Sequence, residues 1–188
     1  MKPLNFVTSN ENKFRECAEV LPIPVKQIKV ELLEIQAKTL KEVAKTKITD
    51  AREKNIETPF FIEDAGFFVE ALKGFPGVYS AYVHSTIGNQ GILKLLKEVE
   101  DRSAHFECVI AYFEAPEKTL RVFTGSVYGK VSQELRGSKG FGFDPIFLPS
   151  ANPTTTFGEM KTVEKNKISH RARALKKFAN HLRMNLDD

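Results

Sequence analysis

A hydrophobic run interrupted by two adjacent acids is the feature that most constrains the fold. Residues Phe60–Val69 read Phe-Phe-Ile-Glu-Asp-Ala-Gly-Phe-Phe-Val. The apolar start, Phe60–Ile62, predicts a short buried strand of an α/β sheet, and Gly66 predicts a turn directly after the acids. We therefore expect Glu63 and Asp64 at the end of the strand, on opposite faces, at an edge where open α/β sheets bind ligands. From this stretch alone, two solvated acids at a strand end remain an equal alternative.

The length and composition favour one globular domain spanning residues 1–188. A chain of 188 residues, 41% hydrophobic and 28% charged, is long enough for one substantial core or two intimate lobes. It contains no apolar window long enough to cross a bilayer, and its first residues lack a signal-peptide core, so we expect a cytoplasmic protein without a membrane partner. Cys17 and Cys108 have no metal-ligand spacing and are expected to be small buried hydrophobes.

The charge balance allows a phosphate-bearing substrate without requiring one. The net charge is +4 and the pI is about 9.0, but the basic residues are scattered and form no stripe. We therefore expect no nucleic-acid partner. A non-catalytic nucleotide-binding or RNA-binding module stays open as a competing hypothesis, motivated by the basic pI.

The junction between the first strand and the first helix is rich in polar side chains. Leu4–Thr8 predicts a strand, and Thr8–Lys13 leads into a helix whose apolar residues recur at helical spacing. The free N–H groups and the positive dipole end of such a helix favour anions, and Lys13 is one turn inside it. The segment has no glycine, so it is not a glycine-rich phosphate loop. Simple capping of the helix is the alternative.

The middle of the chain predicts scaffold elements. Thr39–Glu42 has the form of a capping box and starts a helix that we interpret as scaffold. Gly74–Gly77 predicts a tight turn before a short helix. Ala104–Phe113 and Leu120–Gly125 predict a long antiparallel hairpin, with its turn at Pro116–Lys118.

Two C-terminal stretches have a composition suited to ligand contact. Gly137–Leu148 places glycines beside Phe141 and Phe143, either of which could stack on a flat base, although core aromatics in a turn are the alternative. His170 and Arg171 follow the cap candidate Ser169 at the start of a helix. Cations are unfavourable in that position unless a bound anion or a carbonyl group relieves them.

Five motifs in this order resemble those of the inosine/xanthosine triphosphate pyrophosphatase family. They are Thr8–Lys13, Glu63–Gly66, Gly74–Ser80, Phe141–Pro145 and Glu164–Arg171. The resemblance extends from the first strand to the last helix. It implies an α/β fold with a long central mixed, curved β-sheet flanked by helices, and two lobes with the nucleotide cleft between them. It also implies a homodimer that hydrolyses ITP, dITP and XTP to the monophosphate and pyrophosphate with Mg²⁺, which removes these nucleotides from the pool.

The resemblance also assigns site residues. Asp64 would accept the proton of the attacking water, and Glu34 and Asp64 would hold Mg²⁺. Ala65 would make a backbone contact to the substrate. The triphosphate would bind to Thr8, Ser9, Asn10, Glu11, Asn12 and Lys13. The base and sugar would bind to Phe141, Gly142, Phe143, Asp144, Lys165, His170 and Arg171.

Two departures from the family pattern limit this transfer. Some relatives have Ser or Thr where this chain has Ala65, and others have a basic residue where it reads Ser80-Ala81-Tyr82. One hydroxyl contact is therefore absent, and one phosphate contact is missing or supplied by another lysine. A related house-cleaning pyrophosphatase that acts on other modified nucleotides, including pyrimidines, is the alternative function.

Overall fold

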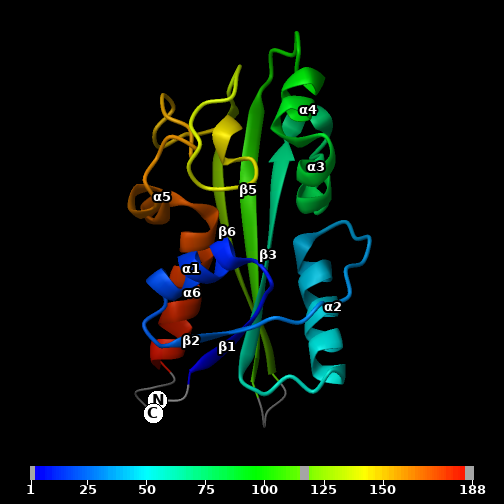
Figure 1. Ribbon diagram of the computed structural model, residues 1–188, viewed down its shortest axis with the longest axis vertical. Helices are drawn as coiled ribbons and strands as arrows, with labels where there is room; N and C mark the ends of the chain where they lie inside the picture. The colour runs from blue at the N-terminus through cyan, green and yellow to red at the C-terminus, as the bar shows by residue number, and fades with distance from the viewer. Residues whose placement is uncertain (1–2, 115–118, 185–188) are drawn as a thin grey trace. The chain divides into compact units, whose positions relative to one another are not determined.

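The computed structural model describes residues 3–114 and 119–184 of the chain. In these ranges a seven-stranded open sheet has the order β2-β1-β3-β5-β6-β7, with β4 paired to β3 (Figure 1). The strands are β1 Leu4–Val7, β2 Val25–Ile28, β3 Phe60–Val69, β4 Pro76–Gly77, β5 Ser103–Glu114, β6 Thr119–Val131 and β7 Phe147–Pro149. The helices are α1 Glu11–Val20, α2 Leu40–Glu53, α3 Ser80–Thr86, α4 Gly88–Leu95, α5 Thr162–Ile168 and α6 His170–Met184, with 3₁₀ turns at Glu70–Leu72 and Asp144–Ile146.

The sheet is mixed, which confirms the predicted fold class. Strand β1 pairs in parallel with β2 and with β3, whereas β3 pairs with β4 and β6 pairs with β7 in the antiparallel sense. Parallel neighbours need a crossover between them, and α1 and α2 supply it for the first three strands. In the described part of the chain, no helix has the length and apolar character needed to cross a bilayer.

The chain divides into two compact units. The first unit takes its residues from 1–64, 108–125 and 171–188, and the second from 65–107 and 126–170. Strands β3, β5 and β6 therefore contribute residues to both. The single-domain organisation expected from the sequence, and the nucleotide cleft expected between two lobes, stay predictions.

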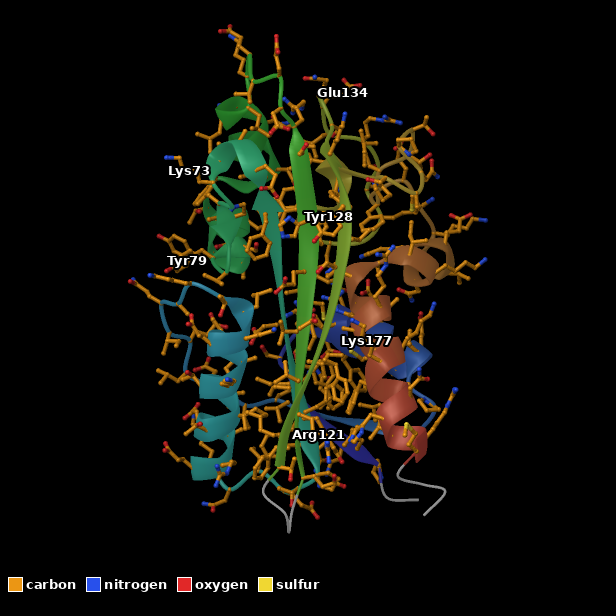
Figure 2. All side chains as sticks on the ribbon, turned by 180° about the vertical axis from the view of Figure 1, so that it is seen from behind. Lys73, Tyr79, Arg121, Tyr128, Glu134 and Lys177 are labelled. Carbon is orange, nitrogen blue, oxygen red and sulfur yellow. The ribbon has the colours of Figure 1, made fainter. Side chains whose placement is uncertain are left out.

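Aromatic packing builds the core of the first unit. Phe6 stacks on Phe61 with ring centroids 4.3 Å apart, and Phe178 of α6 lies 5.2 Å from Phe61. All three side chains are buried, and full burial of such a side chain is worth about 1.5–3 kcal/mol. In this unit α1 and α6 cover one face of the strands and α2 covers the other (Figure 1). Lys177 holds α6 to the sheet by donating to the Thr124 carbonyl at 2.7 Å (Figure 2).

The core of the second unit is centred on Phe67. Its ring lies 4.7 Å from that of Phe106 and 5.1 Å from that of Phe143. Phe147 meets Phe67 edge-on at 5.9 Å. These offset and edge-on contacts are the arrangements that aromatic quadrupoles favour. The amide of Phe67 also donates to Ser80 Oγ at 2.7 Å, which ties α3 to β3.

The predicted strand end at Glu63 and Asp64 is wrong. Strand β3 continues for ten residues through both acids and through Gly66, and it lies between β1 and β5 in the sheet. Gly66 is required for close approach: a Cβ there would lie 2.6 Å from the carbonyl oxygen of Gly77, on the strand that pairs with β3. The glycine therefore marks the contact with β4, and the acids lie in the middle of a central strand.

The predicted N-terminal caps of helices α1 and α2 are confirmed. Asn10 caps α1 by accepting the amide of Lys13 at 3.0 Å, and Thr39 and Glu42 form the predicted capping box of α2. Strand β6 is longer than predicted, because it continues past Gly125 to Val131. The predicted hairpin turn at residues 116–118 lies outside the described residues.

Candidate active site

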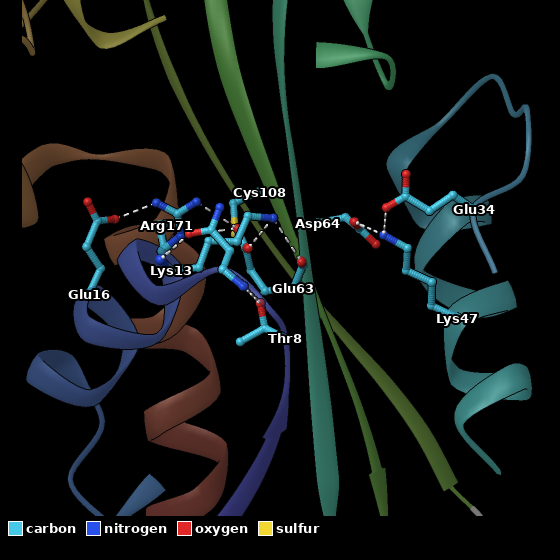
Figure 3. A network of polar contacts seen from close by, with 10 residues as sticks. Thr8, Lys13, Glu16, Glu34, Lys47, Glu63, Asp64, Cys108 and Arg171 are labelled. Carbon is cyan, nitrogen blue, oxygen red and sulfur yellow. Dashed lines mark hydrogen bonds and ion pairs between the residues drawn. The ribbon is translucent and has the colours of Figure 1, made fainter. Parts of the chain in front are cut away.

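Glu63 and Asp64 are directed to opposite faces of β3, as the alternation of a strand predicts (Figure 3). Both carboxylates are almost fully buried, with 5% of Glu63 and 8% of Asp64 exposed. Buried carboxylates are costly unless they are paired with cations or hydrogen-bond donors. Each of the two faces therefore has its own cluster of partners, and all of these partners belong to the first unit.

On one face, Lys47 joins the two acids that were predicted to bind metal. Its Nζ lies 2.7 Å from Asp64 Oδ1 and 2.8 Å from Glu34 Oε1. Lys47 comes from the middle of α2, whose start is fixed by the capping box. Burial opposes charging of this lysine, but the attraction and hydrogen bonds of Asp64 and Glu34 outweigh burial and raise the pKa of its ammonium. The hydrogen bond from Lys47 lowers the pKa of Glu34 in turn.

Sequence reasoning missed Lys47 because it treated α2 only as scaffold. The apolar stripe of this helix does pack, with Val43, Ala44 and Ile48 buried. Lys47 lies beside that stripe, and no local motif marks it. A lysine four residues after a buried residue such as Val43 is common in amphipathic helices. This spacing therefore could not have indicated that Lys47 contacts Asp64.

The Asp64 face fits a divalent metal. Glu34 and Asp64 meet at a single cation, the Lys47 ammonium, so their oxygens converge. Within the described residues, Asp64 Oδ2 is buried and has no hydrogen-bond partner. Mg²⁺ prefers oxygen ligands and is commonly held by one or two carboxylates together with substrate phosphates. The donor set therefore suits the metal implied by the family resemblance.

On the other face, the Glu63 carboxylate is held by two cations and a thiol. Lys13 Nζ lies 2.8 Å from Glu63 Oε2, and Arg171 Nη2 lies 3.1 Å from Glu63 Oε1. The thiol of Cys108 donates to Glu63 Oε1 at 3.1 Å. Arg171 also pairs with Glu16, so the cluster contains two carboxylates and two cations. Arg171 is only 1% exposed, and its predicted counter-anion is supplied by the protein itself.

The electrostatics of this cluster keep Glu63 ionised. Burial alone would raise the pKa of the Glu63 carboxyl, but Arg171 and Lys13 outweigh burial and hold it well below its ordinary value. Burial likewise opposes the charge of Arg171, yet Glu63 and Glu16 keep the pKa of its guanidinium above the usual value. Burial, then Glu63, raises the pKa of the Cys108 thiol, so it stays protonated. Cys108 and Cys17 are buried free thiols, as expected.

The predicted triphosphate segment surrounds the start of α1 in the same unit. Thr8 Oγ1 accepts the amide of Asn10 at 3.1 Å, and Asn10 caps the helix. Ser9, Asn10, Glu11 and Asn12 are exposed, and Glu11 pairs with Lys29. Lys13 reaches across to Glu63 and donates to its backbone carbonyl at 3.2 Å as well.

The second unit contains the residues predicted to bind base and sugar, apart from Arg171. Lys165 is buried and pairs with Asp144 Oδ2 at 2.6 Å. The same oxygen accepts the amide of Phe141 at 2.9 Å, and Lys165 Nζ lies 4.9 Å from the centre of the Phe141 ring. His170 is buried and stacks on Phe106 at 4.7 Å.

Phe141 and Phe143 differ in their exposure to solvent. Phe143 is 2% exposed and packs on Phe67, which is the core alternative left open by the sequence. Phe141 is partly exposed, so stacking on a base stays a prediction for this ring. Gly142 lies between them with φ of 63°, and its carbonyl accepts the Asn89 side chain at 3.0 Å. Ala65, the predicted backbone contact, belongs to the same unit.

A surface pocket of about 350 Å³ in the second unit is separate from these residues. It is lined by residues of α4, of the segment that follows it and of the segment 133–135, including Arg102. Arg102 donates hydrogen bonds to the backbone carbonyl groups of Leu96, Val131 and Ser132, so its guanidinium stabilises the backbone around the pocket. None of the predicted site residues lines this pocket.

The fold and the site define an open mixed-sheet α/β protein whose central strand presents a carboxylate site suited to a divalent metal. The model of the Ham1 family matches residues 4–181, and the chain belongs to this family.

Curated relatives match this chain over nearly its full length. The dITP/XTP pyrophosphatase of Thermococcus kodakarensis is 55% identical over 186 residues, covering 97% of this chain and 98% of the relative. That of Pyrococcus horikoshii is 48% identical over 184 residues, covering 96% and 97%. The Ham1 protein of Staphylococcus aureus has a similar structure, with a TM-score of 0.82, 28% identity, and coverage of 96% of this chain and 99% of that chain. A Ham1 protein of Coxiella burnetii gives a TM-score of 0.81 with 32% identity, over 96% and 99%.

Proposed function

We propose that this chain is a nucleoside triphosphate pyrophosphatase that hydrolyses dITP, XTP and ITP to the monophosphate and pyrophosphate. The full-length relatives named dITP/XTP pyrophosphatase support this assignment. The observation that carries it is the convergence of Glu34 and Asp64 on one cation, while Asp64 Oδ2 is buried and has no hydrogen-bond partner in the described part of the chain. Such an enzyme removes deaminated purines from the nucleotide pool.

Asp64 is the proposed proton acceptor. In the reaction, water attacks the α-phosphorus, its proton passes to Asp64, and the bond from the α-phosphorus to the bridging oxygen breaks to release pyrophosphate. Asp64 Oδ2 is suited to this role because it has no hydrogen-bond partner among the described residues. Glu63 is a poor alternative, since Arg171, Lys13 and Cys108 hold its carboxylate as a buried anion on the other face.

We propose Mg²⁺ as the metal, held by Glu34 and Asp64 together with the phosphates of the substrate. When bound, it would supply positive charge that stabilises the developing charge on the phosphates. The chain contributes Lys13 and the N-terminus of α1, where Thr8, Ser9, Asn10, Glu11 and Asn12 are proposed to meet the triphosphate. Lys13 is held near β3 by Glu63, which reduces the freedom this cation has to lose on binding an anion.

Selection of the base is proposed to rest on hydrogen-bond donors. Hypoxanthine and xanthine carry an acceptor oxygen where adenine carries an amino group, so a site that offers donors there leaves adenine unpaired. Such a site rejects the mismatched analogue by roughly 10⁴ or more. Phe141 is the proposed stacking face, with Ala65, Gly142, Asp144, Lys165 and His170 as further contacts. Phe143 and Arg171 complete the proposed base and sugar contacts, with Arg171, His170 or backbone N–H groups as the proposed donors.

The proposal extends to a homodimer, which the family resemblance implies, and to a cytoplasmic protein with no nucleic-acid or membrane partner. A related enzyme for other modified nucleotides remains the second candidate, because Ala65 departs from the family pattern.

The test is a substrate panel measured by pyrophosphate release with Mg²⁺. Deaminated purine triphosphates should release pyrophosphate, whereas ATP and the other standard triphosphates should be nearly inert. Release of inorganic phosphate in place of pyrophosphate would contradict the reaction. Activity confined to modified pyrimidines would favour the second candidate.

A further inference from the structure

Lys47 occupies the point at which the two predicted metal ligands meet. Its ammonium is within 2.8 Å of Glu34 Oε1 and 2.7 Å of Asp64 Oδ1, and its side chain is 12% exposed. Helix α2 fixes the origin of this side chain through its capping box, while Glu34 lies in the segment before the helix, with its side chain 74% exposed (Figure 3).

Lys47 contacts one oxygen of each carboxylate. Asp64 Oδ1 is taken by the ammonium, and among the described residues Asp64 Oδ2 remains buried without a hydrogen-bond partner. One positive charge faces two negative charges, so the cluster keeps a net negative charge. A divalent cation that binds both carboxylates must take over oxygens that the ammonium now contacts.

We propose that Lys47 is an internal counter-ion that competes with a divalent cation for Glu34 and Asp64. The proposal rests on the function proposed above. Metal alone must displace the ammonium and gains only two carboxylates, so it binds weakly. Metal that arrives on a triphosphate brings phosphate oxygens of its own, so its binding depends less on the oxygens that Lys47 holds. The enzyme therefore takes up its metal together with the nucleotide.

A purely structural salt bridge makes the opposite prediction. If Lys47 only stabilises the fold, its removal leaves two carboxylates that repel each other and move apart, and metal binds no better. If Lys47 competes, its removal leaves a free carboxylate pair. The affinity of the nucleotide-free protein for metal therefore separates the two roles, independently of any turnover.

The experiment is calorimetric titration of Mn²⁺ into the nucleotide-free full chain. Lys47→Met should bind Mn²⁺ about tenfold or more tightly than wild type, because a directly competing charge in a partly buried site is removed. Lys177→Met is the matched control, since Lys177 donates to the Thr124 carbonyl at 2.7 Å and contacts neither Glu34 nor Asp64. It should leave Mn²⁺ affinity within about twofold of wild type. Adding Asp64→Asn to Lys47→Met should remove the gain.

An affinity of Lys47→Met equal to or weaker than that of wild type overturns the proposal. If this variant does not fold, acetylation of the wild-type protein decides. Saturating Mn²⁺ should raise the rate at which acetic anhydride modifies Lys47, measured by mass spectrometry, and leave the rate at Lys177 unchanged. An unchanged rate at Lys47 overturns the proposal. Failure of the proposed function appears separately, as absence of pyrophosphate release from dITP by wild type.

Discussion

Glu63 and Asp64 are neighbours in the sequence, but their carboxylates lie on opposite faces of β3 and have opposite surroundings (Figure 3). Glu63 is held by Arg171, Lys13 and Cys108. Asp64 is bound through one oxygen to Lys47 and keeps the other without a partner in the described structure. Strand β3 therefore separates a carboxylate held by two cations and a thiol from one with a single cationic partner.

Replacing Asp64 by Asn should reduce turnover of dITP by at least about 10²–10⁴-fold while nucleotide still binds, because the proposed proton acceptor is lost. Steady-state pyrophosphate release and nucleotide binding by calorimetry check the two parts. Asp101→Asn is the matched control, because Asp101 is an exposed acid of the second unit whose carboxylate accepts the Ser103 amide at 2.9 Å. A near-normal rate in Asp64→Asn would move the proton-acceptor role to another group.

Replacing Glu63 by Gln should destabilise the protein by about 3–5 kcal/mol, because it leaves buried cations without their counter-charge. Urea unfolding at pH 7 measures the change. Glu11→Gln is the control: Glu11 also pairs with a lysine, but both side chains are exposed, and such pairs are worth about 0–1 kcal/mol. Equal losses in the two variants would show that the buried cluster is no more important than a surface pair.

The same cluster predicts an acid-dependent loss of stability. The native pKa of Glu63 is held below its ordinary value of 4.5, chiefly because Arg171 and Lys13 outweigh the effect of burial. Below pH 4.5, Glu63 binds a proton in the unfolded chain but stays ionised in the folded chain. The contribution of Glu63 to the free energy of unfolding is therefore full at neutral pH and falls as the solution becomes more acidic. The stability gap between wild type and Glu63→Gln should therefore narrow by about 1.4 kcal/mol for each pH unit below 4.5. Urea unfolding at pH 7, 5, 4 and 3 measures the gap, and a constant gap would contradict the assignment.

Local patterns predicted local structure well. The helix caps at Asn10 and Thr39 follow from short-range rules, in which side chains accept backbone amides and apolar residues recur at regular spacing. The mixed sheet was expected from the family resemblance. Alternation along a strand also placed Glu63 and Asp64 on different faces. The family resemblance supplied the site residues, which no single motif would have indicated.

The failures came from contacts between distant segments. Gly66 indicates a turn when read locally, but it is kept within β3 because the Gly77 carbonyl approaches it. Lys47 and Glu16 were missed because each is an ordinary polar residue of an amphipathic helix until its distant partner is known. Long-range ion pairs leave no periodic signal in a single sequence.

Phe141 and Phe143 should respond differently to replacement by Ala. Phe143→Ala removes a buried ring next to Phe67 and should cost about 3–5 kcal/mol of stability. Phe141→Ala should cost less stability, because its ring is partly exposed, and should raise KM for dITP if that ring stacks on the base. Thermal unfolding and initial rates measure the two effects. A larger loss of stability in Phe141→Ala would contradict the placement of the two rings.

Gly140 and Gly142 provide a matched pair that tests the Asp144 carboxylate. Both have positive φ, 72° and 63°, so Ala at either position meets similar backbone strain. At Gly140 a Cβ would also lie 2.1 Å from Asp144 Oδ2, whereas at Gly142 it would meet nothing within 4 Å. Gly140→Ala must therefore move the carboxylate that holds the Phe141 amide and Lys165.

Relative to Gly142→Ala, Gly140→Ala should lose a further 1–3 kcal/mol of stability, roughly the cost of overpacking. It should also raise KM for dITP with little change in kcat, because the partners of Asp144 are proposed to contact the base and not the reacting phosphate. Urea unfolding and steady-state kinetics of the two variants, measured side by side, give both differences. Equal behaviour of the two variants would mean that the Asp144 carboxylate does not organise this segment, and the base contacts proposed for Phe141 and Lys165 would lose their structural basis.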